Sequence, residues 1–253
     1  MANNIRYFIG NWKMFGTPKS INILNKINKF VKSDKKFNKK YTTVITPPHT
    51  LVENFAKTLK NQRVIIGAQN CYHKDNFGAN TGAVSPYMIK SLDAKYVIVG
   101  HSDNRAEGDS ETMIKKKVEN VLKNKMNVIF CIGENKVDKL KKRTFKVLKR
   151  QILNSLDTKF NYKNIIVAYE PIWSIGTGLI PTPNDLIKTT LFIKKILKNI
   201  FKIKSSPAVL YGGSVDSSNI KQFKNLPEIN GFLIGGASKS NKKFIDIIKN
   251  YYR

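Results

Sequence analysis

Residues 95–134 read KYVIVGHSDNRAEGDSETMIKKKVENVLKNKMNVIFCIGE, and this stretch decides the fold class. It begins with a short apolar run at 95–100, continues with a lysine-rich segment at 110–124, and ends with a second apolar run at 127–133. Short, continuously apolar runs are typical of parallel strands buried on both faces, and apolar residues spaced three and four apart predict an amphipathic helix. The stretch therefore predicts a strand, a helix and a further parallel strand.

The same alternation recurs along the chain without a linker or low-complexity segment. Further helices are expected at 20–30, 185–200 and 241–252. Eight strand–helix units in 253 residues, 41% of them hydrophobic, predict an α/β fold with one domain, a closed (β/α)8 barrel over residues 1–253. The expected strands are 6–12, 42–46, 64–68, 95–100, 127–133, 165–170, 208–213 and 231–236.

The composition argues against a secreted or membrane-spanning protein. Cys71 and Cys131 are too few for a disulfide framework, and Cys131 lies in an apolar run, where a buried reduced thiol is expected. Strand-like sequence begins within the first residues, which leaves no room for a cleavable leader. No apolar run approaches the ~20 residues needed to span a bilayer. We therefore expect a cytoplasmic protein with no membrane partner.

The net charge of +28 is the unusual bulk property of the chain. Lysines are spread along nearly every expected helix, and neither an arginine-rich tail nor a base-reading module is present. We therefore interpret the excess as solvated helix faces and expect no specific nucleic-acid partner. A field of this sign also attracts anionic ligands.

Polar side chains follow several of the expected strands at the point where each strand ends. Asn11 and Lys13 follow the first strand, His101 the fourth, Glu134 the fifth and Glu170 the sixth. The active site of a (β/α)8 barrel lies at this end of the strands. A cation, an imidazole and two carboxylates there indicate acid–base chemistry.

Glycine clusters follow the last two strands, with Gly212 and Gly213 after the seventh and Gly235 and Gly236 after the eighth. Backbone N–H groups at glycine can approach a phosphate closely, and many barrels bind phosphate after these two strands. A further pair of glycines lies in the Gly-Thr-Gly sequence at 176–178. These positions predict a small phosphorylated substrate.

Seven motifs together resemble triosephosphate isomerase, in that family's order and over nearly the whole chain. The resemblance implies a TIM barrel that interconverts dihydroxyacetone phosphate and D-glyceraldehyde 3-phosphate through an enediolate, without a metal or an organic cofactor. It also implies a role in glycolysis and gluconeogenesis. The motifs are GNWKM (10–14), GAQN (67–70), VGHS (99–102), CIGE (131–134), AYEPIWSIGTG (168–178), YGGSV (211–215) and GGAS (235–238).

The resemblance also implies a role for each site residue. Glu170 matches the base that moves a proton between two carbons, and His101 matches a neutral imidazole that polarises the substrate carbonyl beside a helix N-terminus. Lys13 matches the cation near the phosphate and the developing charge, and Asn11 its polar neighbour. The residues implied to bind the substrate phosphate are Gly176, Ser214, Gly235 and Gly236.

Residues 171–181 are expected to form a lid that excludes water and retains the intermediate. Trp173 would exchange its indole N–H between Tyr169 and Glu134 as the lid moves. Pro181 has no N–H to offer Tyr211, so we expect altered closure. The lid and latch residues are Pro171, Trp173, Thr177, Gly178, Tyr169, Glu134 and Tyr211, and Ser214 is expected to meet the N–H of Gly178.

Three further residues depart from the family pattern. Asp103 is one methylene shorter than the usual glutamate that steadies the lysine, so Lys13 is expected to be less well oriented. Asn104 and Ala83 replace charged residues near the surface by which the family dimerises. We still expect a homodimer through the loop around Thr81.

Two alternatives remain open. A different phosphate-binding barrel enzyme, such as another sugar-phosphate isomerase, would explain the glycine clusters but not the motifs at 10–14, 99–102 and 168–173 together. A non-catalytic barrel paralogue that binds polyanions or nucleic acid would explain the net charge of +28 and the altered segment after His101. Isomerase turnover separates both alternatives from the main interpretation.

Overall fold

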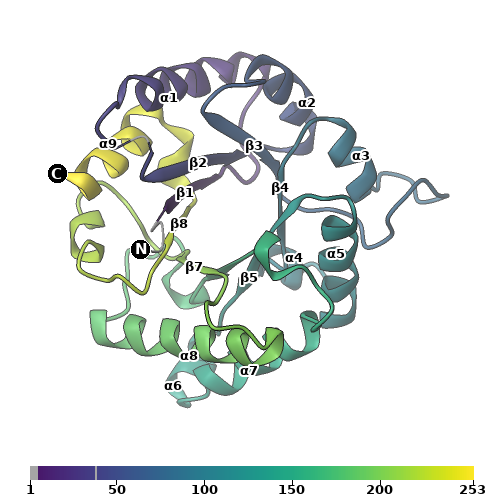
Figure 1. The fold of residues 1–253 in the computed structure, drawn as a ribbon, viewed down its shortest axis with the longest axis vertical. Coiled ribbons are helices and arrows are strands. Elements are labelled where there is room, and N and C mark those ends of the chain that lie inside the picture. Colours follow the sequence, from purple (N-terminus) through teal and green to yellow (C-terminus); the bar gives the residue numbers. More distant parts are fainter. Residues whose placement is uncertain (1–4, 38) are drawn as a thin grey trace.

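The computed structural model describes residues 5–37 and 39–253, and its strands close into a parallel barrel in sequence order (Figure 1). The structure does not describe residues 1–4 and Asn38. The expectation that the chain has no cleavable leader concerns residues 1–4 and so lies outside the described part. All eight expected strands are present, and β8 pairs with β1 to close the single-domain TIM barrel. The strands are β1 (Arg6–Asn11), β2 (Tyr41–Thr46), β3 (Val64–Ala68), β4 (Tyr96–Val99), β5 (Asn127–Ile132), β6 (Ile165–Tyr169), β7 (Ala208–Tyr211) and β8 (Gly231–Ile234).

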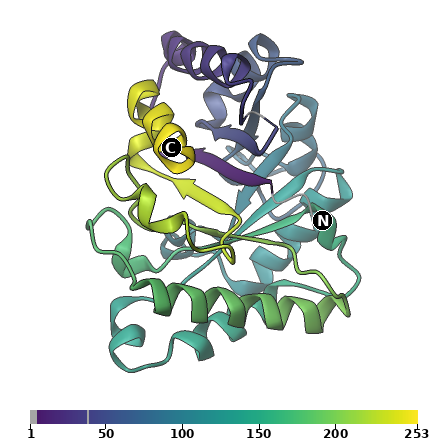
Figure 2. The same cartoon turned by 60° about the vertical axis from the view of Figure 1, so that its left-hand side comes forward.

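Helices surround the barrel on its outside (Figures 1 and 2). Within the described residues, no helix combines the length and the apolar character needed to cross a membrane. The α-helices are α1 (Ile21–Ser33), α2 (His49–Thr58), α3 (Pro86–Ser91), α4 (Ser102–Ala106), α5 (Glu111–Lys123), α6 (Lys136–Leu140), α7 (Thr144–Ser155), α8 (Pro183–Phe201) and α9 (Asn241–Tyr252). The 3₁₀ turns are η1 (Pro18–Ser20), η2 (Tyr162–Asn164), η3 (Ile172–Ser174), η4 (Ile220–Phe223) and η5 (Gly236–Lys239).

Local sequence explains where α8 begins and ends. The Thr182 hydroxyl accepts a hydrogen bond from the N–H of Asp185, and Pro183 occupies the first helical position, where no N–H is needed. The negative charge of Asp185 lies in the first turn, where it interacts favourably with the positive end of the helix dipole. Lys202 then takes a left-handed conformation and ends the helix.

One connection differs from the expected alternation of strands and helices. Between β7 and β8 the described chain forms only the short 3₁₀ turn η4 instead of an α-helix. Its Ile220 and Phe223 are nevertheless fully buried, and the Phe223 ring packs against Tyr211 and Phe232 of the adjoining strands. The turn therefore covers this side of the barrel with fewer residues than a helix would need.

Apolar side chains fill two separate layers, as a closed barrel requires. The inner layer lies within the barrel and includes Ile9, Ile98, Ile129 and Leu210. The outer layer packs between the strands and the surrounding helices. Cys131 belongs to the inner layer, where it is a free buried thiol as expected, and Cys71 belongs to the outer layer and is also free and buried. Burial raises the pKa of the Cys71 thiol to about 12.

A buried ion pair joins α5 to the segment just before it, and a hydrogen bond from the same lysine reaches the loop that follows β3. The ammonium group of Lys117 lies 2.6 Å from a carboxylate oxygen of Asp109 and donates a further hydrogen bond to Asn70, and Lys117 is only 3% exposed. A buried charge is tolerated when its partner and its hydrogen bonds are in place, whereas removal of one partner leaves the other charge unpaired.

We therefore predict that Lys117→Met lowers the free energy of unfolding by about 3–5 kcal/mol. Urea denaturation followed by circular dichroism measures this change. Lys116→Met, at the exposed neighbouring position, is the matched control and should stay within about 0.5 kcal/mol of the parent. Equal stabilities of the two variants would contradict the assigned role of the pair.

Candidate active site

The carboxyl ends of the strands open into a pocket of about 690 Å³. Its lining includes Gly178 of the expected lid, together with Gly212, Gly213 and Lys243. The other lid and latch residues support this pocket from outside its lining, as described below. The pocket brings together every residue expected to be catalytic or to bind the substrate, namely Asn11, Lys13, His101, Glu170, Gly176, Ser214, Gly235 and Gly236.

Close packing of the backbone fixes the position of Glu170. Its N–H donates to the carbonyl of Ile132 on β5 at 2.7 Å. A Cβ atom on Gly133 would lie 1.8 Å from the carbonyl oxygen of Glu170, and a Cβ atom on Gly212 would lie 2.6 Å from its Cγ. Only glycine fits at either position without displacing Glu170. The side chain is therefore held from both neighbouring strands.

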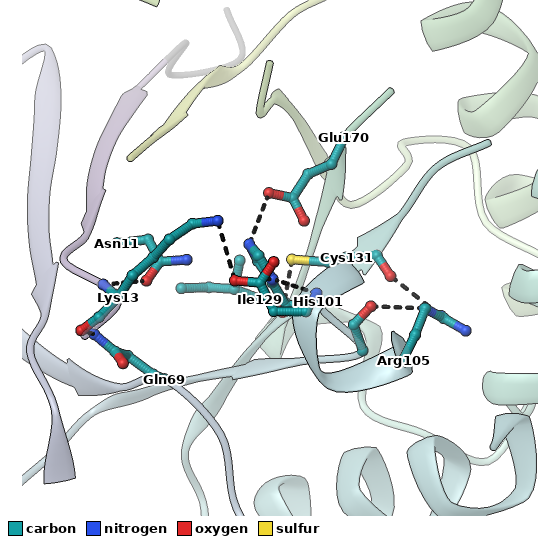
Figure 3. A network of polar contacts seen from close by, with 10 residues as sticks. Asn11, Lys13, Gln69, His101, Arg105, Ile129, Cys131 and Glu170 are labelled. Atoms are coloured by element: carbon teal, nitrogen blue, oxygen red, sulfur yellow. Dashed lines mark hydrogen bonds and ion pairs between the residues drawn. The ribbon is translucent and has the colours of Figure 1, made fainter. Parts of the chain in front are cut away.

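The carboxylate of Glu170 is buried, with 4% of the residue exposed. Its Oε1 atom lies 3.4 Å from Nε2 of His101, and its Oε2 atom has no hydrogen-bond partner among the described residues (Figure 3). A buried, unpaired carboxylate oxygen costs free energy. Because this residue lines the pocket, a proton on a bound ligand can satisfy that oxygen.

The hydrogen bonds of His101 define which of its ring nitrogens carries a proton. Its Nδ1 atom accepts the backbone N–H of Asp103 at 3.1 Å at the start of α4. A nitrogen that accepts an N–H cannot itself be protonated, so the 3.5 Å approach of an Asp103 oxygen to Nδ1 is not an ion pair. The imidazole is thus neutral, with its proton on Nε2, which points toward Glu170 (Figure 3).

Lys13 adopts a left-handed backbone conformation, with φ at +54°, which is strained for a residue with a side chain. Its N–H donates to Oδ1 of Asn11, and its carbonyl accepts from Gln69 (Figure 3). Its ammonium group lies 3.0 Å from a carboxylate oxygen of Asp103. The shorter Asp103 thus still contacts Lys13, and the expectation of a less well oriented lysine stays a prediction. The start of α4 brings the carboxylate close enough to make contact.

Arg105 is a supporting residue that the motifs did not single out. Its guanidinium donates to the carbonyls of Gly100 and Cys131, at the ends of β4 and β5, and pairs with Glu111 at 3.1 Å (Figure 3). These contacts hold the segment that carries His101 against the neighbouring strand. The sequence carries no motif for these contacts, because two of the three partners are carbonyl groups of the main chain.

At its amino end the lid is anchored to Glu134. The indole N–H of Trp173 donates to Oε1 of Glu134 at 2.9 Å, and the Tyr169 hydroxyl donates to the same carboxylate at 3.2 Å. Burial, reinforced by the charge of Glu134, raises the pKa of Tyr169, which keeps this hydroxyl protonated as a donor. Of the two hydrogen-bond partners expected for the Trp173 indole, Tyr169 and Glu134, the structure shows the bond to Glu134.

At its centre the lid is docked on the loop after β7. Ser214 accepts the N–H of Gly178 at 3.1 Å, as expected, and donates to the carbonyl of Ser174 at 2.7 Å. The Tyr211 hydroxyl lies 2.9 Å from the Ser174 hydroxyl, so it has a partner in the lid although Pro181 offers none. The Thr177 hydroxyl donates to the carbonyl of Trp173 and braces the lid internally.

The part of the pocket that is expected to hold the phosphate is lined by backbone and by one cation that the sequence did not reveal. A Cβ atom on Gly235 or Gly236 would meet nothing within 4 Å, so the backbone there is open to a ligand. Lys243 of α9 lines the same end, beside Asp216. A hydrogen bond from Ser218 is the main cause that lowers the pKa of Asp216, and the charge of Lys243 adds to it.

Comparisons with known proteins identify the family. The triosephosphate isomerase family model matches residues 6–251. The chain belongs to the triosephosphate isomerase family. The triosephosphate isomerases of Rhizobium meliloti and Thermodesulfovibrio yellowstonii are 35% and 36% identical over 99% and 96% of this chain and 98% of each relative. The crystal structure of triosephosphate isomerase from Bartonella henselae superposes with a TM-score of 0.89 at 31% identity, over 98% of this chain and 99% of that one.

Two of the residues that depart from the triosephosphate isomerase pattern line a second cavity. Ala83 and Asn104 line a cavity of about 340 Å³ beside the loop between β3 and α3, which projects from the barrel (Figure 1). Thr81 is exposed on this loop. In the described residues, no three His, Cys, Asp or Glu side chains converge as they would to hold a metal ion.

We predict that Lys243→Gln weakens the binding of inorganic phosphate about 2–5-fold, because an exposed charge interaction contributes up to about 1 kcal/mol. Isothermal titration calorimetry measures the affinity. Lys242→Gln is the matched control, since Lys242 is exposed on the same helix but does not line the pocket. Equal affinities of the two variants would show that Lys243 does not act on the anion.

Proposed function

We propose that the chain is a triosephosphate isomerase, an aldose–ketose isomerase that interconverts dihydroxyacetone phosphate and D-glyceraldehyde 3-phosphate through an enediolate. The observation that supports this most directly is the buried Glu170 carboxylate, which lies 3.4 Å from the neutral imidazole of His101 in a pocket that also contains Lys13. A base, a neutral N–H donor and a cation are the three groups that this proton transfer needs.

In the proposed reaction, Glu170 removes a proton from the hydroxymethyl carbon of the ketose phosphate. The C–H electron pair forms the carbon–carbon double bond of the enediolate, and the carbonyl oxygen takes up the charge. The N–H at Nε2 of His101 and the ammonium of Lys13 stabilise that oxygen, with Asn11 beside them. A proton then passes from the hydroxyl oxygen of the first carbon to the former carbonyl oxygen, and Glu170 returns its proton to the neighbouring carbon, so the aldose phosphate forms with no net loss of protons.

The remaining site residues would bind the phosphate and keep the site dry. We assign the phosphate to the backbone N–H groups of Gly176, Ser214, Gly235 and Gly236, with Lys243 as an additional cation. The docked lid supports this assignment because Gly178 and Ser174 both bond Ser214. Exclusion of water strengthens the electrostatic interactions within the site and protects the enediolate from side reactions.

The same proposal includes the cellular setting and the assembly. Cytoplasmic residence and a role in glycolysis and gluconeogenesis follow from the proposed reaction. A homodimer through the loop around Thr81 is supported by the projection of that loop and by the exposed ring of Phe77 on it (Figure 1). A projecting loop with an exposed aromatic residue is suited to insertion into a partner.

We predict that Glu170→Gln lowers kcat by at least ~10²-fold, because the amide cannot accept the carbon-bound proton. A coupled assay of D-glyceraldehyde 3-phosphate isomerisation measures the change. Glu53→Gln, an exposed position on α2, is the matched control and should retain full activity. Inactivity of the folded wild-type protein would reject the isomerase and favour the polyanion-binding alternative.

We further predict that Thr81→Arg converts a dimer into a monomer, because a charged side chain is costly to bury in an interface. Light scattering after size-exclusion chromatography measures the mass. Lys90→Glu, on neighbouring α3, tests whether any charge change near the loop has the same effect. A wild-type chain that elutes as a monomer at all concentrations would contradict the proposed assembly.

A further inference from the structure

The segment 136–150, which contains α6 and the first half of α7, differs in composition from the rest of the chain. Eight of its fifteen residues are lysine or arginine and one is acidic, whereas the whole chain has 45 lysines and arginines in 253 residues. None of these fifteen residues lines the candidate active site. The proposed reaction therefore does not account for this concentration of charge.

The cations of this segment are exposed and largely unpaired. Among the described residues, only Lys139 of the eight lies within 4 Å of a carboxylate, that of Asp185 at 3.5 Å. Cations that repel one another without local compensation raise the attraction of the surface for anions. The exposed and unpaired ones are Lys136, Lys141, Lys142, Arg143, Lys146, Lys149 and Arg150.

Large apolar side chains are interspersed with these cations. Val137 and Leu140 lie three residues apart on α6, and so on the same side of it, and they are 57% and 74% exposed. Phe145 is 43% exposed and stacks on Phe192 of α8 with ring centroids 4.4 Å apart. Leu191, next to Phe192, is 51% exposed. Figure 2 shows α6 and α7 on the outer edge of the molecule, beyond α8.

The expectation that lysines only solvate helix faces does not describe this segment. On α1, Lys26 and Lys29 are exposed as well, but no large apolar residue of that helix is exposed beside them. Transfer of exposed aliphatic and aromatic side chains out of water lowers the free energy, whereas solvated lysines need no partner. The segment 136–150 combines both properties on adjoining elements.

We propose that residues 136–150 form a binding surface for anionic lipid bilayers. Lysine and arginine side chains contact the anionic headgroups, while Val137, Leu140 and Phe145 enter the interface between the headgroups and the acyl chains. A nucleic acid would satisfy the cations equally, but its phosphate backbone offers no apolar phase for the leucine and valine side chains. The exposed apolar residues therefore favour a lipid surface.

The test is co-sedimentation of the full-length protein with vesicles of phosphatidylcholine containing about 30% phosphatidylserine, compared with phosphatidylcholine alone. We expect binding to the anionic vesicles only, and a loss of binding as the salt concentration rises. Lys141→Glu/Lys142→Glu should lower the affinity at least ~10-fold. Lys26→Glu/Lys29→Glu changes the net charge equally on α1, and its effect should stay below about 2-fold.

A second variant separates the lipid surface from a general polyanion site. Val137→Ser/Leu140→Ser keeps the charge and should weaken vesicle binding at least ~3-fold, because apolar area no longer enters the interface. Unchanged thermal unfolding of each variant confirms that the fold is intact. The proposal would be overturned by an absence of vesicle binding, by equal losses in the two charge variants, or by serine variants that bind as the wild type does while duplex DNA competes.

Discussion

The contact between β5 and β6 at the carboxyl end of the barrel is the constraint on which the site depends. The carbonyl oxygen of Glu170 occupies the space where residue 133 would carry a Cβ atom, so the two strands can meet there only because residue 133 is glycine. The hydrogen bond from the Glu170 N–H to Ile132 completes this contact. On the other side, Gly212 of the segment after β7 leaves room for the Glu170 side chain. The Glu170 carboxylate, the proposed base, is thus positioned by packing of the main chain.

The other polar groups are organised around that fixed carboxylate. The start of α4 keeps Nδ1 of His101 occupied by a backbone N–H, which directs the ring proton on Nε2 toward Glu170. Lys13 is held in a strained conformation by Asn11 and Gln69. Strain of this kind persists only where surrounding contacts enforce it, and here those contacts come from the ends of two different strands, β1 and β3. The closed barrel makes this convergence possible because it brings all eight strand ends into one ring.

The strands and most of the residues that line the pocket could be predicted from the sequence. A buried parallel strand is recognisable as a short apolar run, and the polar residues of the pocket follow such runs directly. Three features had no such signal. Lys243 resembles any other helical lysine, and only the path of α9 brings it to the pocket. No glycine or proline marks the break between α6 and α7, where Lys142 turns left-handed. The contact of Ser174 with Tyr211 depends on how the lid docks, which neighbouring residues along the chain do not encode.

Backbone packing that positions the base is the central claim, and Gly212→Ala tests it most directly. The added Cβ atom would lie 2.6 Å from Cγ of Glu170 and must displace the carboxylate, while leaving every group assigned to phosphate in place. Displacement of a catalytic group by about 1 Å can cost up to ~10²-fold in rate. We predict that kcat for isomerisation falls at least ~10-fold while the affinity for inorganic phosphate stays within about 2-fold of the wild-type value. An unchanged kcat in the folded variant would contradict the claim.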